Sequence, residues 1–347
     1  MISNTKIFHL PIALVVLLML SCCGDTDEPV SDQDVADQAT IEAYLAENDS
    51  LAEAHESGIY YVIVDTVPSG TQAAGNIMSI FYSAAIMGGS EIDNITKGEE
   101  DSVMLKQGVD AIYPVGLDIG LSLMKEGETF RFYIPSSLAY GDYSSSLIPE
   151  NSIIVIEVEV AAIHNVADII DDQHDQIEEY IEVQKLDSTI IDSVFNSTLN
   201  EWVHTDTTLF HPLDSVEYLI SDQIYFKRQS EGTAGNMVIG GESATISYIG
   251  TTLSGDEFDR RPFATPLTYA FGTGEIIEGL DAGISVMERN EEALIIIPSH
   301  KAYGESVFVI PRFIKQDFVD LEIIPQYAAK VNPYEVVIFE TTLQNNP

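Results

Sequence analysis

The stretch Gly279-Leu-Asp-Ala-Gly-Ile-Ser-Val-Met287 has a close counterpart earlier in the chain, Gly116-Leu-Asp-Ile-Gly-Leu-Ser-Leu-Met124. The spacing of its apolar residues predicts a short helix, and its two glycines allow that helix to approach a sheet closely. Alternating apolar residues predict strands at 245–249 and 130–134, and at the end of each copy. This order of elements indicates an α+β fold in which an antiparallel sheet wraps on one short helix.

The repeat extends beyond this helix. Ile134-Pro-Ser-Ser-Leu-Ala-Tyr-Gly141 matches Ile297-Pro-Ser-His-Lys-Ala-Tyr-Gly304 at the same offset of 163 residues. A repeat of this length indicates a domain duplication rather than a solenoid. We therefore expect a signal peptide at 1–24, a flexible tether and short helix at 25–50, a first domain at 51–165, an acidic helical linker at 166–220 and a second domain at 221–347.

The charge of the chain is strongly negative, with 56 acidic and 15 basic residues and a formal net charge of −41. A surface of that sign repels phosphate backbones, so we expect no nucleic-acid binding. The apolar share of 45% is sufficient for two packed domains.

The N-terminus has the pattern of an export signal. Lys6 precedes the short apolar run at 12–20, which ends at Cys22 and Cys23. This ending resembles the lipobox of bacterial lipoproteins, which implies lipid modification of Cys22, or of Cys23. The alternative is a plain cleaved signal peptide. Because these are the only two cysteines, and the seven histidines form no ligand pattern, we expect no disulfide, metal or cofactor downstream.

Several ordered blocks resemble the FKBP-type peptidyl-prolyl isomerases. In the second copy they are 248–259, 272–283 and 297–304, and the first copy has counterparts at 82–93, 112–120 and 130–141. The resemblance covers about 75–165 and 238–345, and it implies two FKBP-like domains. It also implies rotation of X–Pro bonds, whose resonance barrier is about 18–20 kcal/mol, by a dry pocket that favours the twisted imide.

The resemblance implies a pocket in the second domain, in which the N–H of Ile277 and the hydroxyl of Tyr303 would bind substrate carbonyls and Asp259 would orient Tyr248. Its residues are Tyr248, Phe258, Asp259, Ile276, Ile277, Leu280, Tyr303 and Phe339. The first-domain counterparts are Tyr82, Ile92, Asp93, Ile112, Tyr113, Tyr140 and Ile156. Two isoleucines replace aromatic walls there, and the register shifts at Pro114, so the first domain is expected to be a weaker enzyme or a binding module.

The second domain carries an extra segment at 305–324, after its Ala-Tyr-Gly turn. Its many large apolar residues predict either packing on the domain or a flap that binds clients. We expect a prolyl isomerase that assists the folding of exported proteins, with proline-containing polypeptides as clients. It would be anchored by lipid to a bacterial membrane in the cell envelope, with its domains outside the cytoplasm. The alternatives are a non-catalytic holdase or assembly module, and a structural lipoprotein that reuses the fold.

Overall fold

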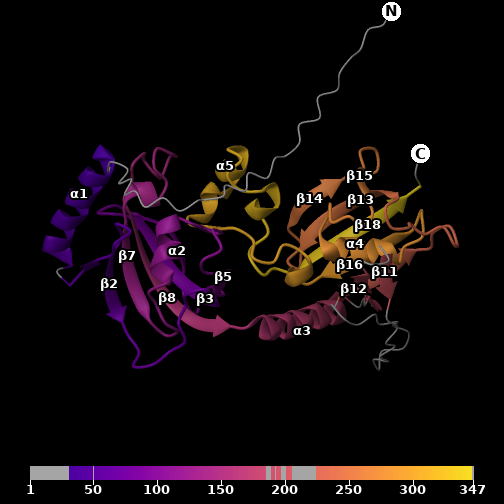
Figure 1. Ribbon diagram of the computed structural model, residues 1–347, viewed down its shortest axis with the longest axis horizontal. Coiled ribbons are helices and arrows are strands. Elements are labelled where there is room, and N and C mark those ends of the chain that lie inside the picture. Colours follow the sequence, from indigo (N-terminus) through magenta and orange to yellow (C-terminus); the bar gives the residue numbers. More distant parts are fainter. Residues whose placement is uncertain are drawn as a thin grey trace, which may run out of the picture.

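A computed structural model describes residues 31–49, 51–184, 189–191, 193–196, 201–204 and 224–345. The expected signal peptide, Cys22, Cys23, the start of the tether and most of the second half of the linker lie outside these residues. Figure 1 shows two sheet-based domains connected by the long helix α3. No helix in the described ranges combines the length and the apolar character needed to cross a membrane.

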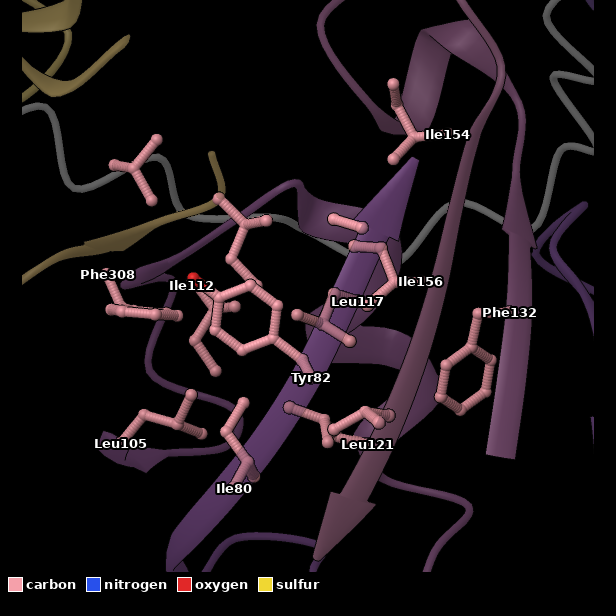
Figure 2. Close-up of a cluster of buried hydrophobic side chains, with 14 of the residues drawn as sticks. Ile80, Tyr82, Leu105, Ile112, Leu117, Leu121, Phe132, Ile154, Ile156 and Phe308 are labelled. Atoms are coloured by element: carbon pink, nitrogen blue, oxygen red, sulfur yellow. The ribbon is translucent and has the colours of Figure 1, made fainter. Parts of the chain in front are cut away.

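Domain 1 is an antiparallel sheet with strand order β1-β2-β7-β8-β3-β4, and β5 pairs with β3. Its elements are α1 (Asp32–Asn48), β1 (Glu53–Ala54), β2 (Tyr60–Asp65), β3 (Ile77–Ile86), β4 (Glu91–Ile95), β5 (Val103–Lys106), β6 (Ile112–Tyr113), α2 (Val115–Leu121), β7 (Thr129–Ile134), the 3-10 helix η1 (Ser136–Leu138) and β8 (Ile154–His164). The concave face of the sheet packs on α2, and Figure 2 shows side chains of this core.

Domain 2 repeats this topology, with strand order β14-β13-β18-β16-β12-β9 and β15 paired with β13. Its elements are β12 (Ile224–Ser230), β13 (Ser243–Thr252), β14 (Glu257–Arg261), β15 (Leu267–Ala270), α4 (Glu278–Ser285), β16 (Glu292–Ile297), the 3-10 helix η2 (Ser299–Lys301) and β18 (Val337–Gln344). The predicted α+β fold class, with two similar domains, is confirmed.

Glycines set the distance between helix and sheet in both domains. A methyl group at Gly279 would lie 2.2 Å from Ile297, and one at Gly116 would lie 2.4 Å from Ile134. Contacts that short are not tolerated, so only glycine lets α4 and α2 lie directly on their sheets.

The linker differs from its expectation. In the part that the structure describes, it contains α3 (Val166–Gln184) and three short strands, β9 (Thr189–Ile191), β10 (Ser193–Asn196) and β11 (Glu201–His204). The apolar stripe of α3 is buried on the outer face of the domain 2 sheet, through Ile177 and Ile181. Helix α1 covers the same face of domain 1 through Ile41 and Leu45. The helix therefore belongs to the repeated unit.

Helix α1 begins at Asp32, and Ser31 caps it by accepting from the N–H of Asp34.

The insertion of domain 2 forms a separate segment, called the strap here and defined as residues 305–331. It contains β17 (Phe308–Val309), η3 (Arg312–Ile314), α5 (Lys315–Asp320) and η4 (Gln326–Ala329). Figure 1 shows α5 and its flanking chain lying between the two domains. Strand β17 pairs in parallel with β6 of domain 1. The peptide bonds Tyr113–Pro114 and Ile310–Pro311 are cis.

Candidate functional site

The sheet register places equivalent residues of the two domains at the same points. Phe339 on β18 lies opposite Gly250 and Ile295. Ile156 on β8 lies opposite Ala84 and Phe132, the corresponding residues of β3 and β7. Ile156 thus occupies the place in domain 1 that Phe339 occupies in domain 2, as the sequence comparison of the two copies predicts.

In domain 2 the expected wall residues come together as one aromatic cluster. The ring of Phe339 lies 5.3 Å from Tyr248 and 5.6 Å from Phe258, both nearly edge-on. The ring of Phe258 in turn lies 5.7 Å from Tyr303, perpendicular to it. Leu280 is buried in the same cluster. Edge-to-face packing of this kind fixes ring positions and excludes water.

Two hydroxyl groups give this cluster its polar character. Tyr248 donates a hydrogen bond of 2.6 Å to Asp259. Burial, followed by this hydrogen bond, raises the pKa of Tyr248 to about 12. Burial also raises the pKa of Tyr303. Both hydroxyls are therefore protonated at neutral pH and can act as donors.

The start of α4 carries the two isoleucines of the predicted site. Ile277 is the residue before the first turn of the helix, and both it and Ile276 pack against the aromatic cluster. The loop before them is held by Asp281, which accepts from the Tyr269 hydroxyl at 2.9 Å and from the Gly272 N–H at 3.0 Å. Asp281 is not among the site residues predicted from the sequence, although it lies within the repeated stretch.

The segment that carries Tyr303 is held by the preceding helix. Gln173 of α3 accepts from the Ser299 N–H at 2.9 Å, and its amide donates to the Ser299 hydroxyl at 2.9 Å and to the Tyr334 carbonyl at 2.6 Å. In domain 1, the Asp37 carboxylate of α1 accepts from both the N–H and the hydroxyl of Ser136. Neither Gln173 nor Asp37 is among the site residues predicted from the sequence. The only sequence signal for these residues is their spacing: Asp37 precedes Ile41 by the same number of residues as Gln173 precedes Ile177.

The strap adds a further aromatic residue to the domain 2 cluster. Tyr327 of η4 stacks on Tyr303, with ring centres 4.1 Å apart. Lys330 donates to the carbonyl of Glu257, next to Phe258, at 2.6 Å. Tyr327 lies beyond the bounds 305–324 that the sequence indicates for the insertion, so this wall is not predicted from the sequence.

Domain 1 keeps the tyrosine–aspartate pair but not the amide donor. Tyr82 donates to Asp93 at 2.8 Å, as Tyr248 does to Asp259. The residue before the first turn of α2 is Pro114, which corresponds to Ile277 before α4. Ile112 and Tyr113, which the sequence predicts as site residues of domain 1, directly precede Pro114. Because proline has no N–H, domain 1 has no amide donor at this position.

The strap packs on a different domain from the one expected from the sequence. The sequence predicts packing on its own domain or a flap, but most of its apolar residues are buried in the core of domain 1. Figure 2 shows Phe308 of the strap beside Tyr82 and Ile112. The groove of domain 1 that corresponds to the domain 2 site is thus covered.

Metal binding finds no support in the described ranges, which contain no cluster of three or more His, Cys, Asp or Glu side chains suited to a metal ion. The domain 2 site offers amide and hydroxyl hydrogen-bond donors in a buried aromatic setting.

Comparisons with known proteins agree with this geometry. The family model for FKBP-type peptidyl-prolyl cis-trans isomerase matches residues 70–161 and 236–344. The isomerase FkpA of Aeromonas hydrophila is 32% identical over 141 residues, which are 40% of this chain and 51% of that protein. Human FKBP10 is 26% identical over 236 residues, which are 67% of this chain and 31% of that protein. The chain thus spans about half or less of the length of these relatives.

Among solved structures, the three FKBP domains of wheat FKBP73 match 84% of this chain and 95% of theirs, with 18% identity and a TM-score of 0.29.

Proposed function

Because the chain belongs to the FKBP-type peptidyl-prolyl cis-trans isomerase family, we propose that it catalyses the cis-trans exchange of X–Pro bonds in polypeptide clients, and that domain 2 carries the activity. One observation supports this assignment most directly. Domain 2 gathers Tyr248, Asp259, Ile277 and Tyr303 around one aromatic cluster, whereas domain 1 has Pro114 in place of the amide donor and a groove covered by the strap.

The reaction needs no covalent step. Rotation about the X–Pro bond is slow because amide resonance must be broken, and the twisted imide has less charge separation than the planar one. A dry pocket lined by Phe258, Phe339 and Leu280 therefore favours the twisted state. The N–H of Ile277 and the hydroxyl of Tyr303 would hold the flanking carbonyls, and such donors accelerate a reaction only if they bind the transition state more tightly than the ground state.

The test uses the complete chain and a chromogenic X–Pro peptide. We expect clear acceleration by the wild type. Tyr303→Phe removes one donor and should reduce kcat/KM about threefold to tenfold, since a net hydrogen bond contributes about 0.5–1.5 kcal/mol. Asp259→Ala removes the acceptor of the Tyr248 hydroxyl. The double variant Tyr303→Phe/Asp259→Ala should have a kcat/KM at least about tenfold below that of the wild type.

Tyr334→Phe is the matched control. It makes the same chemical change in the same domain, at a buried hydroxyl with no hydrogen-bond partner. Its rate should equal that of the wild type. If the wild type does not exceed the uncatalysed rate, catalysis is refuted. If the wild type is active and the Tyr303→Phe and Asp259→Ala changes have no effect, the activity does not lie in this cluster.

We further propose that the protein is exported and anchored by lipid, on the basis of the N-terminal sequence. The supporting features are the apolar run at 12–20 and the cysteine pair that follows it. Expression in a bacterium with a labelled fatty acid tests this. Cys22→Ala should abolish incorporation and Cys23→Ala should preserve it. The reverse result would show that Cys23 is the modified residue. If the wild type and both variants all lack the label, the N-terminus is a plain signal peptide.

A further inference from the structure

The groove of domain 1 binds a polypeptide segment within this structure, and that segment is the strap. The contact begins at the backbone. Strand β17 pairs in parallel with β6 as a separate two-stranded sheet, in which the Phe308 N–H donates to the Ala111 carbonyl and the Ile310 N–H donates to the Tyr113 carbonyl, both at 2.8 Å. Addition of a strand to an exposed edge is a common mode of peptide recognition.

Side chains of the strap fill the groove. Phe308 is 1% exposed and meets the ring of Tyr82 edge-on at 6.0 Å. Phe318 is 4% exposed and lies edge-on against Tyr113 at 5.6 Å and against Tyr140 at 6.2 Å. Fully burying one such side chain contributes about 1.5–3 kcal/mol, so these contacts stabilise the strap on domain 1.

A charged pair fixes the register of the strap. The Arg312 backbone N–H donates to Asp93 at 2.8 Å, and its guanidinium donates to the same carboxylate at 2.9 Å and to Glu100 at 3.1 Å. Asp93 also accepts from Tyr82. The fork of an arginine suits a carboxylate better than a lysine does, so the groove selects arginine at this point.

One group in the groove is left unsatisfied by the strap. The Tyr140 hydroxyl is buried and has no hydrogen-bond partner, and the residue is 9% exposed. It lies beside a cavity of about 820 Å³ lined by domain 1 and strap residues, among them Tyr143, Phe318 and Leu321. An unpartnered buried hydroxyl costs about 1–3 kcal/mol, so a segment that brings a carbonyl to Tyr140 would bind better than the strap does.

We propose that domain 1 is a binding site for extended polypeptide segments with the order large apolar, aliphatic, aliphatic, proline, arginine, and that the strap residues Phe308-Val-Ile-Pro-Arg312 are its resident ligand. Client segments of this chemistry compete with the strap for Asp93 and Tyr82. The binding is separate from the isomerase activity proposed for domain 2, because it uses a different groove and requires no catalysis.

The test is a competition between the strap and the same sequence in trans. A fluorescein-labelled peptide of residues 305–314 is titrated with the complete chain. The wild type should bind it weakly, because a tethered segment reaches an effective concentration of about millimolar. The variant Phe308→Ser/Arg312→Ser weakens the strap but leaves the groove intact, and it should bind the peptide at least tenfold more tightly. Adding Asp93→Asn to that variant should remove the gain.

The controls separate docking from general loosening. Phe313→Ser changes a strap residue that is 44% exposed, and it should bind the peptide as weakly as the wild type. A peptide with glutamate in place of the arginine should not bind the weakened variant. Arg312→Ser alone is a milder variant that keeps all the apolar packing, and it should still increase the affinity severalfold.

Equal affinity of the wild type and Arg312→Ser for the peptide, with both chains folded by circular dichroism, would overturn the proposal. So would a gain that survives Asp93→Asn. Because X–Pro exchange is measured separately, loss of isomerase activity would not affect this result, and failure of the competition would leave the activity of domain 2 intact.

Discussion

Gln173→Leu tests the idea that α3 is part of the domain 2 site rather than a linker. The side chain is 3% exposed and makes three hydrogen bonds, two to Ser299 and one to the Tyr334 carbonyl. Leucine has a similar volume but cannot form them. The Ser299 N–H and the Tyr334 carbonyl would lose these partners.

The expected magnitude follows from these groups. Each buried polar group without a partner costs about 1–3 kcal/mol, and leucine regains part of this by apolar burial, so the free energy of unfolding of domain 2 should fall by about 2–4 kcal/mol. Ser299 is four residues from Tyr303, so the kcat/KM for an X–Pro peptide should fall as well.

Hydrogen exchange read out by mass spectrometry gives the stability of each domain in the complete chain. Peptides from β16 and β18 should lose protection, and peptides from β7 and β8 should not. Gln176→Leu makes the same change at an exposed position of α3 and should leave both domains unchanged. Protection of β16 and β18 that is equal in Gln173→Leu and the wild type would show that the helix does not support the domain.

Further predictions concern packing, pH and the strap. Gly279→Ala places a methyl group 2.2 Å from Ile297 and should destabilise domain 2 by about 1–3 kcal/mol in urea unfolding, and Ile297→Ala in the same chain should cost less than the sum of the two single changes. Burial lowers the pKa of Lys315, so the unfolded chain binds more protons between the folded pKa and the ordinary value of 10.5, and stability should rise with pH in that window. Lys315→Met should remove this contribution, and an identical pH dependence of the two chains would contradict it. Tyr143→Phe removes the hydroxyl that donates to Asp317 at 2.5 Å and should change stability by less than about 1 kcal/mol, because that bond is exposed.

The local features of the fold could be predicted because they depend on neighbouring residues. Period-two patterns indicate strands, and the glycine spacing of 279–287 indicates a helix in close contact with a sheet. The tyrosine–aspartate pairs could be predicted because they recur at the same spacing in both copies. These features specify the fold of each domain and most of the walls of its site.

The strap could not be placed from sequence because its partners are distant. Arg312 and Asp93 are 219 positions apart, and a pattern within one segment carries no information about which groove it fills. The apolar composition of the insertion predicts burial on its own domain or a client-binding flap, but it does not indicate that the core of domain 1 buries it. The sequence indicates a register change at Pro114, and the caps of α2 and α4 show that Pro114 occupies the place of Ile277.

Because the strap belongs to domain 2 but fills the groove of domain 1, domain 1 is completed only late in synthesis. Domain 1 emerges from the ribosome first. The strap, which fills the groove of domain 1, belongs to domain 2 and is the last segment to be synthesised before β18. Until residue 318 has been synthesised, Tyr82, Tyr113 and Tyr140 line a groove without its cover. The N-terminal half of the nascent chain therefore has an exposed aromatic surface that its own C-terminal half must later bury. A chain that is truncated before the strap retains that surface permanently.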